Sequence, residues 1–308
     1  MQPDVRRDRC RQILPVLALV ALVALEGVWP APALAQTLER DLFVTVLDRT
    51  GTPVPDLGPG AFAIREDGRL REVLRVKPAT EPIDLAVLID TSAAATSQIS
   101  DLRLGLNAFI TKMRGPARLA LIEFGERPHA ITDYTADAVL LAQGVGRIFA
   151  RPGSGAYALD GIIETLNGFK KRDAERAAIV VVWLGGPEFS NRDDRSVLTL
   201  LGEQSVALHV LTVSRGAAPD VMTVDGRSRE SVFGRGPDIS GGSRQNILSS
   251  MAITDSLGRI AAELLAQYRV TYARPQTLIP PEKIEVRATG NDLTARGTPP
   301  RAKATPPK

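Results

Sequence analysis

The stretch LAVLIDTS at residues 85–92 decides the fold of this chain. Its first five residues are a continuous apolar run, which is typical of a β-strand buried on both faces. Asp90 and Ser92 follow at the expected carboxyl end of that strand. Sites in open parallel sheets form at this edge, and hard cations such as Mg²⁺ take carboxylate and hydroxyl oxygens. The stretch therefore predicts a central parallel strand with a polar site at its end.

Strand-like runs and helical patterns alternate after this stretch. The runs that predict strands cover residues 117–124, 178–184 and 206–213. The helical patterns, with apolar residues spaced by three, four and seven, cover 98–113, 137–149, 157–170, about 197–201 and a segment from about Thr254. This alternation predicts an α/β fold, a doubly wound and mostly parallel sheet with right-handed crossovers.

Short β segments flank the predicted α/β domain. Residues 41–48 alternate apolar with polar side chains, and 62–66 and 70–76 predict two strands joined by a turn at Asp67-Gly68. The later strand patterns, which could complete the same β unit, are 268–272, 283–287 and 293–296. Residues 214–242 are rich in Gly, Ser and Arg, and we expect a mobile surface loop there.

The predicted organisation has five parts. They are a signal peptide at 1–35, an N-terminal β unit at 36–80, the α/β domain at 81–267, returning β strands at 268–296 and a disordered, Pro-rich basic tail at 297–308.

Composition limits the function classes. The chain has 308 residues, 44% hydrophobic and 24% charged, as in soluble globular proteins, which excludes a largely disordered, collagen-like or polytopic membrane chain. A net charge of only +3 and an aromatic content of 5% argue against nucleic acid as a partner.

The N-terminus has the pattern of an export signal. Arginines at 6–11 precede an apolar run at 13–25, and WPAPALA at 29–35 predicts cleavage after Ala35. The run is too short to span a bilayer comfortably, although an uncleaved anchor is the alternative. We expect an exported protein, periplasmic or secreted, that starts at Gln36 and lacks Cys10, the one cysteine. Such a chain has no disulfide and no thiolate chemistry.

Residues 85–92 resemble the first strand of a von Willebrand factor type A (VWFA) domain. Segments 43–48, 62–68 and 264–272 extend the likeness to bacterial secreted proteins that embed such a domain between short β segments. The resemblance covers roughly residues 40–296. It implies a Rossmann-like fold and a role in protein binding or cell adhesion.

The resemblance also implies a metal-ion-dependent adhesion site (MIDAS), which is degenerate here. Its positions in this chain are Asp90, Ser92, Ala94, Ser154, Gly155, Ala156 and Gly185. Asp90 and Ser92 match the family's ligands. Alanine stands at the third position and at the family's threonine, and glycine stands at the later aspartate.

Two ligands make a weak magnesium site, because Mg²⁺ sheds its water reluctantly. We therefore expect no metal cofactor; the alternative is Mg²⁺ or Mn²⁺ at Asp90 and Ser92, with charge supplied by Glu188, Asp193 or Asp194. The structural interpretation of Asp90 is that its carboxylate accepts backbone N–H bonds in the strand-end loop.

Ser92 is a candidate nucleophile for a hydrolytic enzyme. A serine nucleophile needs a base, and the chain has only His129, in an expected loop, and His209, inside an apolar strand and expected to be buried and neutral. No Gly-x-Ser-x-Gly motif occurs. We expect no enzyme, with a Ser92-dependent envelope hydrolase as the alternative.

Together these features predict a non-enzymatic, exported protein-binding module that uses the strand-end crevice and its loops, 214–242 included, without a metal. The partner is expected to be a protein, with no nucleic acid and no stable membrane span after signal cleavage. A metal-dependent adhesin with a rebuilt site is the alternative within the same fold.

Overall fold

The computed structural model describes residues 37–300 except 214–219, 277, 278, 280 and 282. The predicted signal peptide and residues 301–308 of the predicted tail lie outside the described residues. The deciding stretch forms β5 (Ile83–Ile89), in which every residue is buried. β5 pairs in parallel with β6 (Ala117–Glu123) on one edge and β8 (Arg176–Trp183) on the other. It is enclosed on both faces and both edges, which explains its unbroken apolar run.

The central sheet has six strands in the order β10-β9-β8-β5-β6-β7. The remaining bounds are β7 (His129–Thr135), β9 (Val206–Val213) and β10 (Arg244–Ile247). All neighbours are parallel except β7, which runs antiparallel to β6. The predicted doubly wound, mostly parallel sheet is confirmed, with β7 and β10 as strands that the sequence patterns did not predict.

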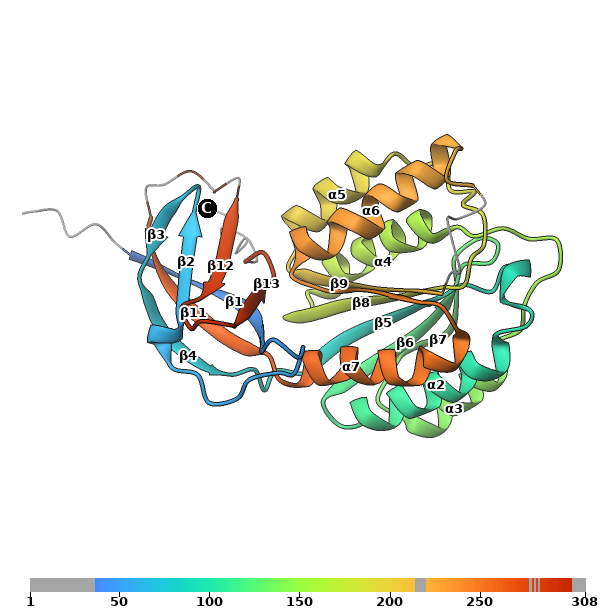
Figure 1. Ribbon diagram of the computed structural model, residues 1–308, viewed down its shortest axis with the longest axis horizontal. Helices are drawn as coiled ribbons and strands as arrows, with labels where there is room; N and C mark the ends of the chain where they lie inside the picture. Colours follow the sequence, from blue (N-terminus) through green and yellow to red (C-terminus); the bar gives the residue numbers. More distant parts are fainter. Residues whose placement is uncertain (1–36, 214–219, 277–278, 280, 282, 301–308) are drawn as a thin grey trace, which may run out of the picture. The chain divides into compact units, whose positions relative to one another are not determined.

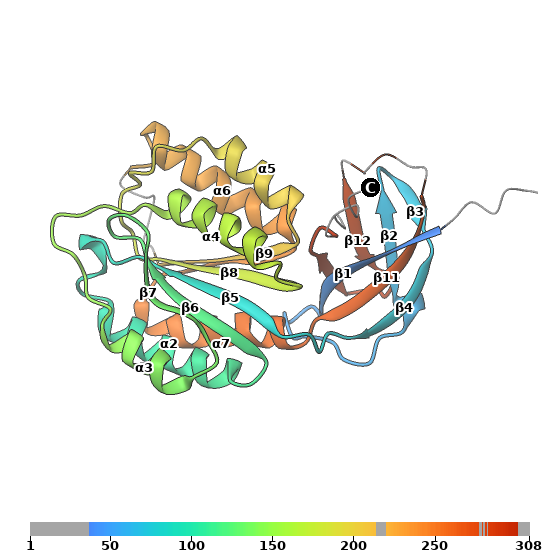
Figure 2. The ribbon, with the colours of Figure 1, turned by 180° about the vertical axis from the view of Figure 1, so that it is seen from behind.

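Helices cover both faces of this sheet (Figure 1). One face carries α2 (Ile99–Met113), α3 (Ala138–Gly146) and α7 (Ile253–Leu265), and the other carries α4 (Ala158–Arg172), α5 (Asp194–Glu203) and α6 (Val224–Ser240). The view from behind shows the same layers (Figure 2). Each face buries its own apolar cluster, so the domain has two cores separated by one sheet.

The order of the strands places a topological switch point between β5 and β8. The chain leaves β5 through α2 on one face, and leaves β8 through α5 on the other. Open α/β sheets bind ligands at the carboxyl ends of strands where connections part in this way. The ends of β5 and β8 are therefore the place to look for a site.

The expectation of a loop over 214–242 is wrong for most of that segment, because residues 224–240 form α6. Thr223 caps the helix by accepting the Gly226 N–H at 3.0 Å, and Gly241 ends it with a φ of +75°. Val232 and Phe233 are buried against the sheet. Helix propensity is weak here, and burial of an apolar face supplies the stability that composition does not.

The flanking segments form two small antiparallel sheets. One is β13-β1-β11-β4, from β1 (Thr37–Leu47), β4 (Val73–Pro78), β11 (Tyr268–Pro275) and β13 (Thr294–Gly297). The other is β12-β2-β3, from β2 (Phe62–Glu66), β3 (Arg69–Arg71) and β12 (Ile284–Ala288). They share one core, which includes Leu42, Val44, Ile64, Val270 and Tyr272. Among the described residues, no helix is long and apolar enough to cross a bilayer.

Candidate functional site

Asp90 lies just past the end of β5 and is fully buried. Its Oδ1 accepts the backbone N–H of Ser92 at 2.9 Å. Its Oδ2 accepts the N–H groups of Leu184 at 2.9 Å and Gly186 at 3.2 Å. Backbone donors therefore compensate this buried carboxylate, as in the structural interpretation of Asp90. The same bonds tie the loop after β5 to the loop after β8.

Ser92 is also buried, and its hydroxyl packs against the loop after β8. A Cβ added at Gly186 would collide with Ser92 Oγ and lie 3.2 Å from the Cβ of Ala156. Within the described residues, Ser92 Oγ has no hydrogen-bond partner. These three residues fill the switch point closely.

The remaining positions of the degenerate adhesion site do come together here. Ser154 accepts the Ala93 N–H through its carbonyl at 3.3 Å, and its hydroxyl donates to a carbonyl of its own loop. A Cβ at Gly155 would collide with the ring of Phe189. Gly185 has a φ of +102°, and its added Cβ would lie 3.9 Å from the Cβ of Ala94. The predicted set is thus a real spatial cluster.

The residues of this cluster do not fit a divalent cation. Both carboxylate oxygens of Asp90 already accept hydrogen bonds from backbone N–H groups. Alanine or glycine occupies three of the family's ligand positions. Asp193 caps α5 by accepting the Ser196 N–H at 3.0 Å, and Asp194 accepts the hydroxyl of Ser231. In the described part of the chain, no group of three or more His, Cys, Asp or Glu side chains could hold a metal.

Glu188, the remaining substitute ligand, caps α4 instead. Its Oε1 accepts the N–H of Ser190 at 3.2 Å and lies 3.5 Å from the N–H of Leu159, while Ser190 Oγ accepts the Asp160 N–H at 3.0 Å. Tyr157, at the N-cap position, supplies no side-chain bond. Burial raises the pKa of Glu188 to about 7, because its side chain is almost wholly removed from water.

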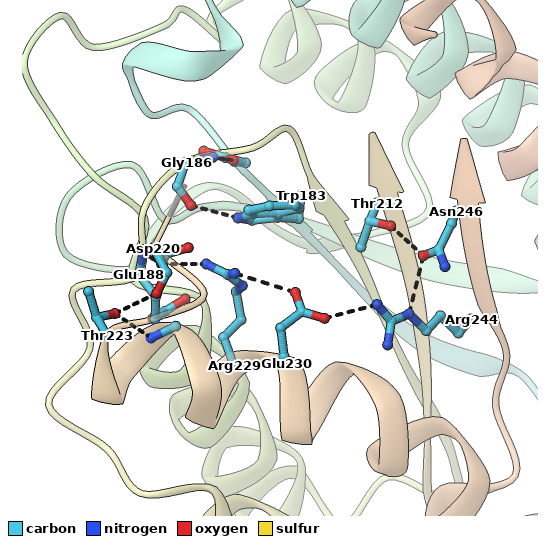
Figure 3. A network of polar contacts seen from close by, with 12 residues as sticks. Trp183, Gly186, Glu188, Thr212, Asp220, Thr223, Arg229, Glu230, Arg244 and Asn246 are labelled. Carbon is cyan, nitrogen blue, oxygen red and sulfur yellow. Dashed lines mark hydrogen bonds and ion pairs between the residues drawn. The ribbon is translucent and has the colours of Figure 1, made fainter. Parts of the chain in front are cut away.

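A buried polar network continues from Glu188 (Figure 3). The Glu188 N–H donates to Asp220 Oδ2 at 2.6 Å, and that oxygen also accepts Arg229 Nη1 at 2.7 Å. The Arg229 guanidinium lies 4.4 Å from the centre of the Trp183 ring. Trp183 Nε1 in turn donates to the carbonyl of Gly186 at 2.9 Å. The network links the loop after β8 to α6, with Arg229 wholly buried.

The network extends to the sheet edge on its more exposed side. Glu230 lies 3.3 Å from Arg229 Nη2 and 3.1 Å from Arg244 Nη2. Arg244 Nε donates to Asn246 Oδ1, which also accepts the hydroxyl of Thr212 (Figure 3). Charge balance is therefore better on this side than around Glu188, where two carboxyl groups share one guanidinium.

Large apolar side chains are exposed around the carboxyl ends of the parallel strands. We call them the apolar rim: Phe149, Phe189, Met222, Val224, Leu248 and Met251, each between 53% and 83% exposed. Phe189 follows β8, the next two follow β9, and the last two follow β10. The loop of Phe149 belongs here too, since the Arg151 N–H donates to the Thr91 carbonyl at 2.8 Å. Carboxyl ends of parallel strands meet at one edge, so the rim residues lie at the same edge of the sheet as the switch point.

Ser92 Oγ has no hydrogen-bond partner in the described residues, so neither histidine is hydrogen-bonded to it. His129 is exposed at the start of β7. His209 is fully buried in β9, with Nδ1 2.8 Å from Ser243 Oγ, and burial lowers its pKa to about 3. The expected neutral, buried His209 is confirmed.

Sequence reasoning missed the apolar rim and the Asp220–Arg229–Trp183 network. Phe189 stands singly in the Gly- and Pro-containing segment GGPEF at 185–189, outside any strand or helix period, and this was a usable signal. The other rim residues carry no common pattern, since Val224 begins α6 and Leu248 follows Ile247 directly. The network had none, because Asp220 and Arg229 fell in the segment expected to be a loop.

The doubly wound sheet, with its topological switch point between β5 and β8, defines a Rossmann-like α/β domain. Comparison with solved structures gives the particular fold, that of VWFA domains. A von Willebrand factor type A protein from Catenulispora acidiphila matches with a TM-score of 0.50 and 9% identity, over 83% of this chain and 72% of that chain. No protein-family model matches the sequence, and no curated protein does.

Two further matches are more distant. The vWF domain of the type V pili tip protein Mfa5 from Porphyromonas gingivalis has a TM-score of 0.33 and 22% identity, over 36% of this chain and 40% of that chain. The conserved hypothetical protein BatB from Bacteroides thetaiotaomicron has a TM-score of 0.45 and 13% identity, over 58% of this chain and 97% of that chain.

Proposed function

We propose that this protein is an exported, non-enzymatic protein-binding module whose partner docks on the apolar rim without a divalent cation. The rim is the observation that carries the proposal. Exposed apolar side chains gathered at one place favour a protein interface, because covering them removes apolar surface from water. Aromatic residues and methionine are enriched in such interfaces, and the rim has two of each.

The packing at the switch point supports the metal-free part of the proposal. Asp90 is compensated by three backbone N–H groups, and Ser92 packs against Gly186. A cation would have to displace those bonds and would gain few new oxygens. The fold supports a binding role by analogy with VWFA proteins, and the pattern at residues 6–35 supports export.

Site-directed photo-crosslinking tests this proposal in the cells that make the protein. With benzoylphenylalanine in place of Phe189, we expect one discrete protein adduct that persists in EDTA. A second change on the rim, Phe149→Asp, should lower its yield at least about five-fold, because a charge enters the apolar interface. The matched control carries the crosslinker in place of Leu140, which is 49% exposed on α3 and outside the rim.

Both the EDTA treatment and the Leu140 control have an outcome that would contradict the proposal. An adduct that disappears in EDTA and returns with Mg²⁺ would favour the metal-dependent adhesin. Equal adduct yields from the Phe189 and Leu140 positions would remove the rim as the docking surface.

A further inference from the structure

Among the described residues, three buried polar atoms of the network around Glu188 have no hydrogen-bond partner. They are Glu188 Oε2, Asp220 Oδ1 and Arg229 Nε, in side chains that are 2%, 6% and 0% exposed. The 2.6 Å bond from the Glu188 N–H to Asp220 Oδ2 makes the two acidic residues neighbours (Figure 3). An unsatisfied polar atom costs free energy in a buried site, so three together need an explanation.

Two of these atoms are carboxylate oxygens, which accept hydrogen bonds and donate none while ionised. A proton on Glu188 changes this, because it turns Oε2 into a donor and removes one of the negative charges. On the α6 side the Glu188 N–H donates to Asp220, which lies beside Arg229, and on the α4 side Ser190 Oγ accepts the N–H of Asp160, which lies beside Arg192. Asp160 and Arg192 pair with each other, as do Asp220 and Arg229. Ionised Glu188 is therefore the unbalanced charge.

We propose that Glu188 is a protonation switch for the loop at residues 184–190, and that it thereby controls the part of the apolar rim carried by Phe189. When Glu188 is protonated, the loop is held inward and caps α4. When the proton leaves to solvent, two ionised carboxylates remain in a buried site beside one guanidinium, and the loop relaxes outward to hydrate Glu188. The second half of this statement rests on the proposed function, whereas the first half does not.

An outward movement of the loop at residues 184–190 would also displace Phe189, which belongs to that loop. Two bonds of 2.7 Å hold it to the neighbouring loop, from the Ala156 N–H to the Pro187 carbonyl and from the Phe189 N–H to the Ala156 carbonyl. Glu188 lies between the bonded residues, and the Phe189 ring covers Gly155. A change at the Glu188 carboxyl therefore acts on the backbone that positions the exposed ring.

The transition falls in a range that an exported protein encounters. Burial raises the pKa of Glu188 to about 7, and the Arg229 charge opposes this shift without cancelling it. The geometry thus places the change of state near neutral pH.

Trp183 is a built-in reporter of this switch. It contacts Arg229 through its ring and the loop through the Gly186 carbonyl. The chain has one other tryptophan, Trp29, so the full chain with Trp29→Phe reports on Trp183 alone. We expect its fluorescence to titrate with a midpoint near pH 7, the pKa of Glu188, and to be flat from pH 5.5 to 8.5 after Glu188→Gln.

Glu230→Gln is the matched control, because Glu230 also contacts Arg229 but is about one-third exposed. It should keep the transition. If Glu188→Gln does not fold, Asp220→Asn replaces it and should move the midpoint at least about one pH unit lower, because the Arg229 charge is then no longer neutralised by the Asp220 carboxylate. A transition that is unchanged in Glu188→Gln, or absent from the parent chain, overturns the proposal.

The crosslinking assay then tests the link to binding. Adduct yield at position 189 should differ at least about three-fold between pH 6 and pH 8, and this difference should vanish in Glu188→Gln. A fluorescence transition with a constant yield overturns control of the rim. A fluorescence transition with no adduct at any pH overturns the proposed function and leaves the switch standing.

Discussion

Asp90 and His209 are both buried polar residues, and the domain accommodates them in different ways. Both side-chain oxygens of Asp90 accept backbone N–H groups, three in all. Among the described residues, the ring of His209 has one hydrogen-bond partner, Ser243 Oγ, and Glu263 lies 3.8 Å from its Nδ1. Burial lowers the pKa of His209 to about 3, so the ring is neutral at ordinary pH. The contact with Glu263 is consequently not an ion pair.

His209 should make the protein sensitive to acid. Its pKa is about 3 in the folded chain and 6.5 in an unfolded one, so the unfolded chain binds the extra proton between these values. Stability is therefore lost as the pH falls below 6.5, by about 1.4 kcal/mol per pH unit. Glu188 acts with the opposite sign, since its raised pKa makes stability fall as the pH rises from 4.5 to about 7.

Urea unfolding of the parent chain and of His209→Gln at pH 4.5, 5.5 and 6.5 isolates the histidine contribution. The parent-minus-variant difference should rise by about 1.4 kcal/mol per pH unit, because every other group cancels. His129→Gln is the control, since His129 is exposed, and it should leave the pH dependence unchanged. A His209→Gln chain with the parent's pH dependence would contradict the assignment of a neutral, buried ring.

At the scale of elements, the turn after β8 organises the candidate site. Gly185 adopts a φ of +102°, which L side chains rarely adopt, and the N–H groups of the residues on either side of it, Leu184 and Gly186, both donate to Asp90 Oδ2. Residues further along the same loop cap α4 through Glu188 and Ser190. The glycine at position 185 thus permits a loop conformation that a residue with a Cβ would strain.

Restoring that aspartate should not restore a metal site. Gly185→Asp should cost about 1–2 kcal/mol of unfolding free energy, because the backbone there is strained for any residue with a Cβ. Calorimetric titration with Mg²⁺ should show no saturable binding, since both Asp90 oxygens hold backbone donors.

Gly168→Asp is the matched control for stability, because Gly168 lies in α4 with nothing within 4 Å of an added Cβ. It should cost less than Gly185→Asp. Saturable Mg²⁺ binding by Gly185→Asp would show that the switch point can open to a cation.

At the scale of the whole molecule, segments from both ends of the chain build the small β sheets. β1 pairs with β13 in a register that sets Val44 opposite Gly297, and β2 pairs with β12 with Ile64 opposite Val286. Their common core combines Leu42 from the early strands with Tyr272 from the late ones. The early strands therefore cannot bury their apolar face without the late ones.

A chain that ends at Gln267 should lose these sheets and keep the α/β domain, whose two cores come from β5 to α7. We expect thermolysin to cut within residues 38–78 at least about ten-fold faster than in the full chain, because local unfolding governs proteolysis. A chain ending at Pro300 is the control and should resist like the full chain. Equal protection of 38–78 in the shorter chain would contradict the shared core.

The sequence alone could predict the strands that are buried on both faces and the helices that have a regular apolar face. The strands 83–89, 176–183 and 206–213 are enclosed on both faces, so each is dominated by apolar residues, with Asp84, Arg176, His209 and Thr212 as the exceptions. The helices 99–113 and 158–172 show one apolar face for the same reason. The resemblance to VWFA domains supplied the seven positions of the degenerate site, and the parallel topology brings them together at the strand ends.

Other elements form only because of tertiary contacts, which the local sequence does not reveal. α6 is a helix because Val232 and Phe233 find a sheet to cover, and half-exposed β7 is a strand because β6 offers it an edge. Local sequence contains neither neighbour. Loops far apart in the chain likewise decide three features of the site. They occupy both Asp90 oxygens, leave the apolar rim exposed and bury the Glu188 carboxyl. Sequence by itself determined which residues meet at the switch point, and only the packing of those loops decided what each polar atom does there.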